Sequence, residues 1–223
     1  MNLNKSYEFF QPENCVERLH IIGCGAVGST VAELLVRFGL TNISLYDFDT
    51  VEAHNIANQM YRHGDIGQLK VDALKNILTE INPDAESGIK VFSNGYENQR
   101  LSGYVFLCLD NIDTRREITQ KCVSNQYIKA IFDFRIRLTD AQHYSADWSD
   151  YDMRQNLLNS MNFTHEEALV ATPQSACNMV LSVAPTVRSI CAVGVSNFIN
   201  FAKGKGLKKL ILIDAFSYTI DSF

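Results

Sequence analysis

The chain of 223 residues lacks several features that mark common classes of protein. It contains six cysteines but no Cys-x-x-Cys pair, so neither a paired-cysteine zinc site nor a disulfide framework is supported. Residues 1–17 lack the apolar segment of a signal peptide, and no apolar run is long enough to span a membrane. No Lys/Arg run is present, and the net charge is −5. We therefore expect a reduced, cytoplasmic protein that binds neither membrane nor nucleic acid.

The composition is that of a folded globular protein, with 46% hydrophobic and 20% charged residues. No Gly-, Pro- or Ser-rich linker divides the chain, and its length suits one domain with a substantial core. We expect a single domain over 1–223, preceded by a polar arm at residues 1–17. The sequence does not decide whether this arm packs on its own domain or on a partner subunit.

A glycine-rich turn follows the first predicted strand, Leu19–Ile22, and precedes a predicted helix from Ser29 to Phe38 that ends at Gly39. In a strand–turn–helix unit, one glycine permits the tight turn, the next admits a phosphate, and the last allows close helix packing. The motif serves NAD, FAD and ATP sites, and a tight turn without a ligand is the alternative. The candidate nucleotide-binding residues in it are Gly23, Gly25, Ala26, Val27 and Gly28.

A second predicted strand, Ile43–Tyr46, ends in the sequence Asp47-Phe48-Asp49. A carboxylate at the tip of this strand is placed to accept hydrogen bonds from the hydroxyls of a ribose. The alternative is that Asp47 is a solvated turn residue. The glycine turn upstream favours the ribose interpretation.

Strands and helices alternate along the next hundred residues. This order predicts an α/β, Rossmann-like, mainly parallel sheet with helices on both faces. Further strands are expected at 89–92, 104–109 and 130–134, and helices at 68–81 and 113–125.

The last third of the sequence has a different pattern. We expect a crossover loop over 137–174 that contains a helix at 150–160, and a long helical stretch over 175–203 interrupted at Pro185. A last strand at 208–213 is expected to pair with the region of Tyr144 at the edge of the sheet.

Five motifs occur in an order that resembles the ubiquitin-activating (E1-like) enzyme superfamily, especially its bacterial ThiF, MoeB and HesA members. Together they cover most of residues 1–135. A weaker similarity to the C-terminal core helix of the family begins at Ala184-Pro185-Thr186-Val187. The five motifs are Gly23–Gly28, Asp47–Glu52, Asn55 with Gln59, Asp65–Lys70 and Asp110–Arg115.

The resemblance implies ATP and Mg²⁺ as cofactors and a homodimeric adenylyltransferase. Such an enzyme adenylates the C-terminal carboxylate of a small ubiquitin-like protein or peptide and releases pyrophosphate. By resemblance, Asp47 holds the ribose, Lys70 meets the phosphates and Asp110 binds Mg²⁺. The remaining nucleotide-binding positions that it implies are Asp49, Asn55, Asn58, Gln59 and Asn111.

Each of these roles has a simpler alternative. Lys70 would otherwise be a solvated residue one turn into its helix, and Asp110 a turn residue or helix N-cap. Asp113 and Arg115 would form only a local ion pair.

One position departs from the family pattern. Members usually carry Asn-Leu-x-Arg-Gln, whose arginine contacts the phosphates, and this chain has Asn58 at the arginine position. Our hypothesis is that Arg62 replaces it if the segment is helical, because residues four apart share a helix face. The alternatives are that Arg62 is structural, and that the chain is a non-catalytic member.

Cys177 is the candidate acceptor of the activated acyl group, because many relatives use a cysteine in the crossover region. A small buried hydrophobe is the alternative. Arg135 and Arg137 would meet a substrate carboxylate or an acidic residue of the loop. We therefore expect an ATP-dependent adenylyltransferase, with a non-catalytic E1-like binding subunit or an NAD-dependent oxidoreductase as the alternatives.

Overall fold

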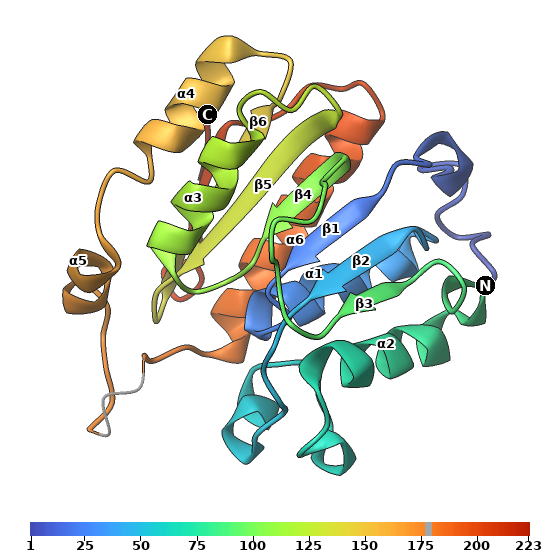
Figure 1. Ribbon diagram of the computed structural model, residues 1–223, viewed down its shortest axis with the longest axis horizontal. Coiled ribbons are helices and arrows are strands. Elements are labelled where there is room, and N and C mark those ends of the chain that lie inside the picture. Colours follow the sequence, from blue (N-terminus) through green and yellow to red (C-terminus); the bar gives the residue numbers. More distant parts are fainter. Residues whose placement is uncertain (177–179) are drawn as a thin grey trace.

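The computed structural model describes residues 1–176 and 180–223, which form one eight-stranded sheet with helices on both faces (Figure 1). The strand order is β3-β2-β1-β4-β5-β6-β7-β8. Neighbours from β3 to β5 run parallel, and those from β5 to β8 run antiparallel. The strands are β1 (Leu19–Ile22), β2 (Ile43–Tyr46), β3 (Lys90–Phe92), β4 (Gly103–Leu107), β5 (Ile128–Ile136), β6 (Asp140–Asp147), β7 (Leu210–Asp214) and β8 (Thr219–Ser222). The predicted α/β class is confirmed.

Six α-helices accompany the sheet in the described ranges, and none of them is long and apolar enough to cross a membrane. In Figure 1, α3 and α4 lie in front of the sheet, and α1 and α6 lie behind it. The α-helices are α1 (Ala26–Arg37), α2 (Lys70–Ile81), α3 (Ile112–Cys122), α4 (Tyr151–Asn159), α5 (His165–Val170) and α6 (Ala184–Ala202). Short 3-10 helices are η1 (Pro12–Asn14), η2 (Ala53–Ala57), η3 (His63–Asp65) and η4 (Pro83–Ala85).

Alternate side chains of the parallel strands enter two separate cores. Ile21 and Phe106 pack with residues of α1, α2 and α6, whereas Ile22 and Val105 pack with residues of α3 and α4. A strand covered on both faces needs apolar residues at successive positions, as β1 and β4 have. The continuous apolar runs of the sequence therefore mark the centre of this sheet.

The first two α-helices begin at residues other than those predicted. The first helix begins at Ala26 rather than Ser29, because Gly25 is its N-cap and the glycine turn forms its first turn. The second begins at Lys70, after Leu69 in extended conformation. Lys70 is therefore the first residue of α2 and not one turn inside it. The strands predicted at 19–22 and 43–46 are confirmed.

Within the expected crossover loop over 137–174, the helix predicted at 150–160 is confirmed by α4, but the expectation of a loop is wrong for the residues before it. The segment begins with β6, an eight-residue strand antiparallel to β5, and continues through α4 and α5. The predicted pairing of the last strand with Tyr144 is confirmed, since Tyr144 is opposite Leu210. That strand is not at the edge, because β8 pairs with its other side.

The long helical stretch predicted over 175–203 begins only at Ala184. Pro185 lies in the first turn of α6, where its missing N–H costs no helical hydrogen bond. The proline therefore starts this helix instead of interrupting it.

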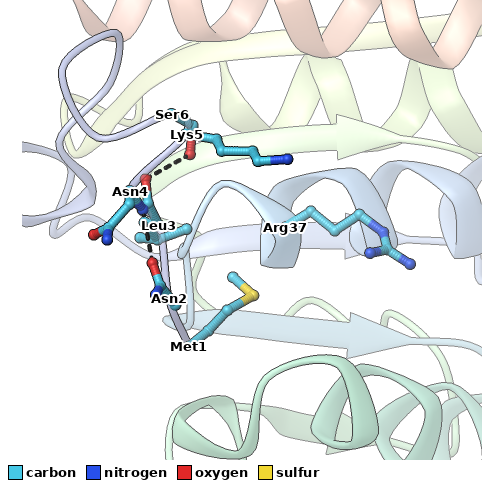
Figure 2. Close-up of a pocket in the computed structure, with 7 residues that line it drawn as sticks. All are labelled: Met1, Asn2, Leu3, Asn4, Lys5, Ser6 and Arg37. Carbon is cyan, nitrogen blue, oxygen red and sulfur yellow. Dashed lines mark hydrogen bonds between the residues drawn. The ribbon is translucent and has the colours of Figure 1, made fainter.

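The N-terminal arm packs on its own domain. Phe10 is buried and meets Phe38 edge-to-face, with ring centroids 5.8 Å apart. The N-terminal ammonium lies 2.7 Å from the carboxylate of Asp84. Figure 2 shows a cavity that this arm lines together with Arg37 of α1. Arg37 ends α1, about 18 Å along the helix from the glycine turn, so this cavity is separate from the predicted nucleotide site.

Candidate functional site

The glycine turn lies at the carboxyl end of β1, between β2 and β4. In parallel α/β sheets this position, where neighbouring connections leave toward opposite faces, is a preferred ligand site. Gly23 has a φ of 91°, and a Cβ there would lie 2.7 Å from the backbone nitrogen of Leu109. A Cβ at Gly28 would lie 1.8 Å from the carbonyl oxygen of Gly23. These two glycines therefore permit the tight turn and the close helix packing that the motif predicts.

The first turn of α1 presents unpaired backbone donors. The N–H groups of Gly25, Ala26 and Val27 donate to no residue in the described parts of the chain. A Cβ on Gly25 would have no atom within 4 Å, so space remains in front of this turn. Unpaired N–H groups at a helix N-terminus attract anions such as phosphate.

Asp47 is held rigidly beside this turn. Its Oδ2 accepts a hydrogen bond of 2.6 Å from the N–H of Cys24, and its Oδ1 accepts one of 2.9 Å from the N–H of Asp49. Burial raises the pKa of Asp47, although both hydrogen bonds and the charge of Lys70 act in the opposite direction. The carboxylate is thus fixed at the tip of β2, where the ribose interaction stays a prediction.

Lys70 reaches the same place from α2. Its Nζ lies 2.7 Å from Oδ2 of Asp49, and its backbone N–H donates to the carbonyl of Asp49 at 2.9 Å. The Lys70 side chain is 9% exposed and that of Asp49 is 51% exposed. Lys70 is therefore not the solvated surface residue of the simpler alternative. Its contact with phosphate stays a prediction.

Tyr61 joins the glycine turn to α2, and sequence reasoning missed it. Its hydroxyl donates to the carbonyl of Cys24 at 2.6 Å and lies 3.2 Å from the carbonyl oxygen of Lys70. Burial raises the pKa of Tyr61, so the hydroxyl stays a donor. The segment around it has no clean periodicity, and no local signal distinguishes this tyrosine from a surface residue.

The polar segment around η2 has mixed roles. Asn55 is buried, and its Oδ1 accepts from the N–H of Glu52 at 2.9 Å in a capping box. The amide of Asn58 donates to Oγ of Ser182 at 3.1 Å. Oε1 of Gln59 is buried and accepts no hydrogen bond in the described structure. Asn55 therefore shapes its own segment, while Gln59 keeps an acceptor unpaired.

The conformation required for Arg62 to replace the missing arginine is absent. Helix η2 ends at Ala57, and Arg62 is the extended N-cap of η3. Its exposed guanidinium lies 2.6 Å from the carboxylate of Glu80 on α2. The shared helix face between positions 58 and 62 was therefore a wrong expectation, and Arg62 has the structural contacts of the alternative.

Asp110 and Asn111 follow β4 and come directly after Leu109, whose backbone lies next to Gly23. The side chain of Asn111 accepts from the N–H of Thr114 at 3.0 Å and caps α3. The N-cap is therefore Asn111 and not Asp110. The Asp110 carboxylate is exposed and accepts no hydrogen bond from the described residues.

The donor set at this point fits a magnesium ion that is shared with phosphate. A carboxylate oxygen is a hard ligand of the kind that Mg²⁺ takes, usually together with water and phosphate oxygens. Within residues 1–176 and 180–223, no group of three His, Cys, Asp or Glu side chains is placed to hold a metal by itself. Asp110 would therefore supply one ligand among several.

Arg115 does not pair with Asp113, which instead pairs with Arg116. Arg115 is buried, pairs with Asp133 of β5, and donates to the carbonyls of Leu107 and Phe134 at 3.2 and 2.7 Å.

The other side of Asp133 binds Arg135, at 2.7 Å between Nε and Oδ2. Burial opposes ionisation of Asp133, but both guanidiniums outweigh it, and the pKa of this carboxyl lies below its usual value. Arg137 lies in the turn before β6, 2.9 Å from the carboxylate of Asp140. Arg137 therefore meets an acidic residue, as one of the two alternatives predicted, while the donors of Arg135 are taken up by Asp133 and Ser160.

The predicted acyl acceptor Cys177 lies outside the described residues. The other five cysteines are free thiols and buried. Burial raises the pKa values of Cys24, which is part of the glycine turn, and of Cys108, so both remain protonated. A neutral, enclosed thiol is a poor nucleophile, and these residues act as small hydrophobic side chains.

Comparison with known proteins agrees with this geometry. The sequence model described as the ThiF family matches residues 15–210. Ubiquitin-like modifier-activating enzyme 5 of Arabidopsis thaliana is 36% identical over 122 residues, which are 46% of this chain and 28% of that protein. The protein of the same name from rice, Oryza sativa subsp. japonica, is 33% identical over 119 residues, again 46% and 28% of the two chains. The match thus spans less than a third of these curated relatives.

Solved structures share the fold over nearly the whole chain. MccB of Escherichia coli, solved with ATP, matches with a TM-score of 0.74 and 17% identity over 95% of this chain and 65% of that one. PaaA matches with a TM-score of 0.71 and 15% identity over 99% and 68% of the two chains. At these identities the similarity establishes the architecture alone.

Proposed function

Because the chain belongs to the ThiF family, we propose that it is an ATP-dependent adenylyltransferase. Its substrate would be the C-terminal carboxylate of a small ubiquitin-like protein or peptide, and pyrophosphate would be released. The names of the relatives support this class, since the curated ones are ubiquitin-like modifier-activating enzymes and MccB was solved both with ATP and with MccA. The chain spans only part of those proteins, so the proposal for its activity is argued from the site residues of this chain.

One observation carries the proposal. The glycine turn, the fixed carboxylate of Asp47 and the enclosed ammonium of Lys70 meet at one edge of the sheet. A ribose acceptor beside a helix N-terminus and a cation is the arrangement that a nucleotide with several phosphates requires. A dinucleotide oxidoreductase would give Lys70 no role.

The proposed reaction needs positioning and charge neutralisation more than covalent help. An oxygen of the substrate carboxylate attacks the α-phosphorus of ATP, the bond to the bridging oxygen breaks, and acyl-adenylate and pyrophosphate result. Two anions must approach, so Lys70 and the N–H groups of Ala26 and Val27 would offset the phosphate charge. Asp47 would fix the ribose and thereby the position of the α-phosphorus.

Asp110 is the residue that would hold Mg²⁺, because its carboxylate is exposed and accepts no hydrogen bond from the residues that the structure describes. The ion, when bound, supplies positive charge to the phosphate oxygens. We also propose a homodimer by analogy with the family.

Exchange of radiolabelled pyrophosphate into ATP tests the proposal, measured with a panel of ubiquitin-like proteins and peptides that have free C-termini. We expect exchange that depends on one acyl substrate and disappears when its C-terminus is amidated. Absence of ATP binding would overturn the proposal.

Asn58 favours a second candidate, a non-catalytic E1-like subunit, because it cannot supply the charge of an arginine. This subunit would bind ATP and the partner protein but exchange no label. Tight NAD binding in place of ATP would instead support the oxidoreductase.

A further inference from the structure

A guanidinium from α6 contacts Met60, two residues after Asn58, and has no counter-ion in the described part of the chain. Arg188 is half-buried in the second turn of α6. Its Nη1 contacts Oγ1 of Thr30 and lies 2.8 Å from Sδ of Met60. Both partners are uncharged, and a thioether sulfur is a weak acceptor. Most of the hydrogen-bonding capacity of this cation is therefore unused.

The position of Arg188 relative to the glycine turn is set by α1. Oγ1 of Thr30 donates to the carbonyl of Ala26, the first residue of α1, at 2.8 Å. One turn further along α6, Sγ of Cys191 lies 3.7 Å from the carbonyl oxygen of Val27. Arg188 thus lies beside the N-terminal turns of α1, and Thr30 links it by two successive hydrogen bonds to Ala26, the residue that begins this helix.

The segment that carries Asn58 packs on the same surface. The amide of Asn58 contacts Ser182, just before α6, and the N–H of Met60 donates to Oγ of Ser29 at 3.2 Å. Between these residues, Oε1 of Gln59 is buried and unpaired within the described structure. The surface formed by 58–60, α1 and the start of α6 therefore holds an uncompensated cation and an unpaired acceptor.

We propose that Arg188 is a phosphate-binding residue and supplies to the triphosphate the positive charge that Asn58 lacks. This inference rests on the proposed function, since it requires ATP at the glycine turn. A guanidinium has five N–H donors in a fork that matches phosphate oxygens, and a half-buried one without a counter-ion favours an anion strongly. The guanidinium of Arg62, in contrast, lies beside the carboxylate of Glu80 on α2, and no hydrogen bond in the described structure joins it to α1 or to residues 58–60.

The competing explanation is that Arg188 only ties α6 to α1 and Met60. A tether would affect every nucleotide alike, whereas a contact to the outer phosphates would affect ATP and not AMP. The ratio of the affinities for ATP and AMP therefore separates the two roles.

The experiment measures the binding of ATP, ADP and AMP by calorimetry to the wild type and to Arg188→Met, which keeps the apolar stem. We expect ATP affinity to fall about 10- to 100-fold and AMP affinity to change less than about twofold. Arg62→Met is the matched control, and we expect it to leave both affinities unchanged. Adding Asn58→Arg to Arg188→Met should restore much of the ATP preference.

Equal losses of ATP and AMP affinity in Arg188→Met, or no loss at all, would overturn the inference. The proposed function would still stand in that case, provided that the wild type binds ATP. A wild type that binds no ATP would overturn both. If Arg188→Met does not fold, Arg188→Gln is measured instead, because it keeps an N–H donor for Thr30 but removes the positive charge. The preference for ATP over AMP should again fall about 10-fold or more. An unchanged preference in a folded Arg188→Gln would contradict the proposal.

Discussion

Two groups of opposite charges lie along the carboxyl edge of the same sheet, and they differ in what they leave open. In the first, Lys70 pairs with Asp49, whose side chain is 51% exposed. In the second, Arg115 and Arg135 enclose Asp133, whose side chain is 0% exposed. We call these the open pair and the sealed cluster.

The sealed cluster is closed by its own hydrogen bonds. Arg115 also donates to the carbonyls of Leu107, Leu109 and Phe134, and Arg135 donates to Ser160. These bonds join the ends of β4 and β5 to the chain after α4. A buried ion pair with its donors satisfied holds the structure together and leaves nothing for a ligand.

The open pair has the opposite character. Lys70 contacts one carboxylate oxygen of an exposed aspartate, beside helix donors that no described residue uses. An arginine or lysine motif therefore indicates a ligand site only when its partners leave donors free. We therefore expect changes in the sealed cluster to lower the free energy of unfolding, and changes in the open pair to lower enzymatic activity.

The largest expected effect comes from breaking the sealed cluster. Asp133→Ala leaves Arg115 buried without its charge partner, and we expect the free energy of unfolding to fall by about 3–5 kcal/mol. Urea denaturation followed by circular dichroism measures this. Asp140→Ala, which removes a carboxylate from an exposed pair with Arg137, is the control and should cost less than about 1 kcal/mol. Similar losses in the two variants would contradict the distinction.

The next largest effect concerns catalysis. Lys70→Met removes a cation that would offset phosphate charge, so we expect pyrophosphate exchange to fall about 100- to 1,000-fold with a nearly unchanged urea midpoint. Lys75→Met, on the same helix α2, should keep its activity. Full activity in Lys70→Met would show that the open pair has no part in the reaction.

Acidification should weaken the fold before it affects the sealed cluster. Burial lowers the pKa of His143 and of His20 from 6.5 to about 4. Between these values only the unfolded chain binds the protons, so stability falls as the pH drops from about 6.5 to 4, by at most about 3 kcal/mol for each histidine.

The pKa of Asp133 is shifted below 3.8, so its contribution is present above that pH and is lost only on further acidification. Urea midpoints at pH 7, 5.5 and 4.5 measure how steeply the stability falls with pH. They are compared between the wild type, His143→Gln and, as the control, His63→Gln at an exposed position. An unchanged slope in His143→Gln would contradict this assignment.

The smallest expected effect lies next to the open pair. Tyr61→Phe removes the donor to the carbonyl of Cys24 and should lower the free energy of unfolding by about 1–2 kcal/mol. Pyrophosphate exchange should fall only severalfold, because Lys70 keeps its bond to Asp49. A loss as large as that of Lys70→Met would assign Tyr61 a direct role.

Sequence reasoning named Lys70 and Asp49 as nucleotide-binding residues, although not as a pair, and it missed the sealed cluster for a physical reason. Gly23 and Asp47 belong to local motifs whose conformation depends on nearby residues, so their positions at the ends of β1 and β2 were predictable, whereas Lys70 was expected one turn inside its helix. Arg115 lies on α3 and its partner Asp133 is 18 residues away on β5, and the partner of Asn58 is 124 residues away. Such pairs depend on how whole elements pack, which no local pattern shows.

The boundaries of strands and helices were likewise predictable where local sequence sets them and not where they depend on packing. The strands β1 and β2 were predicted to the residue, since apolar runs and turn residues define them. The exposed edge strand β8 was missed, because all four of its residues are exposed and carry no buried face. The start of α6 at Ala184 depended on recognising Pro185 as a first-turn residue.

The structure of the chain with bound AMPCPP, a non-hydrolysable analogue of ATP, tests the central claim most directly. The predicted result is a ribose within hydrogen-bonding distance of Asp47, and phosphates that contact Lys70 and the N–H groups at the start of α1. A nucleotide bound at the glycine turn with Lys70 still turned to Asp49 and no phosphate within reach would contradict it.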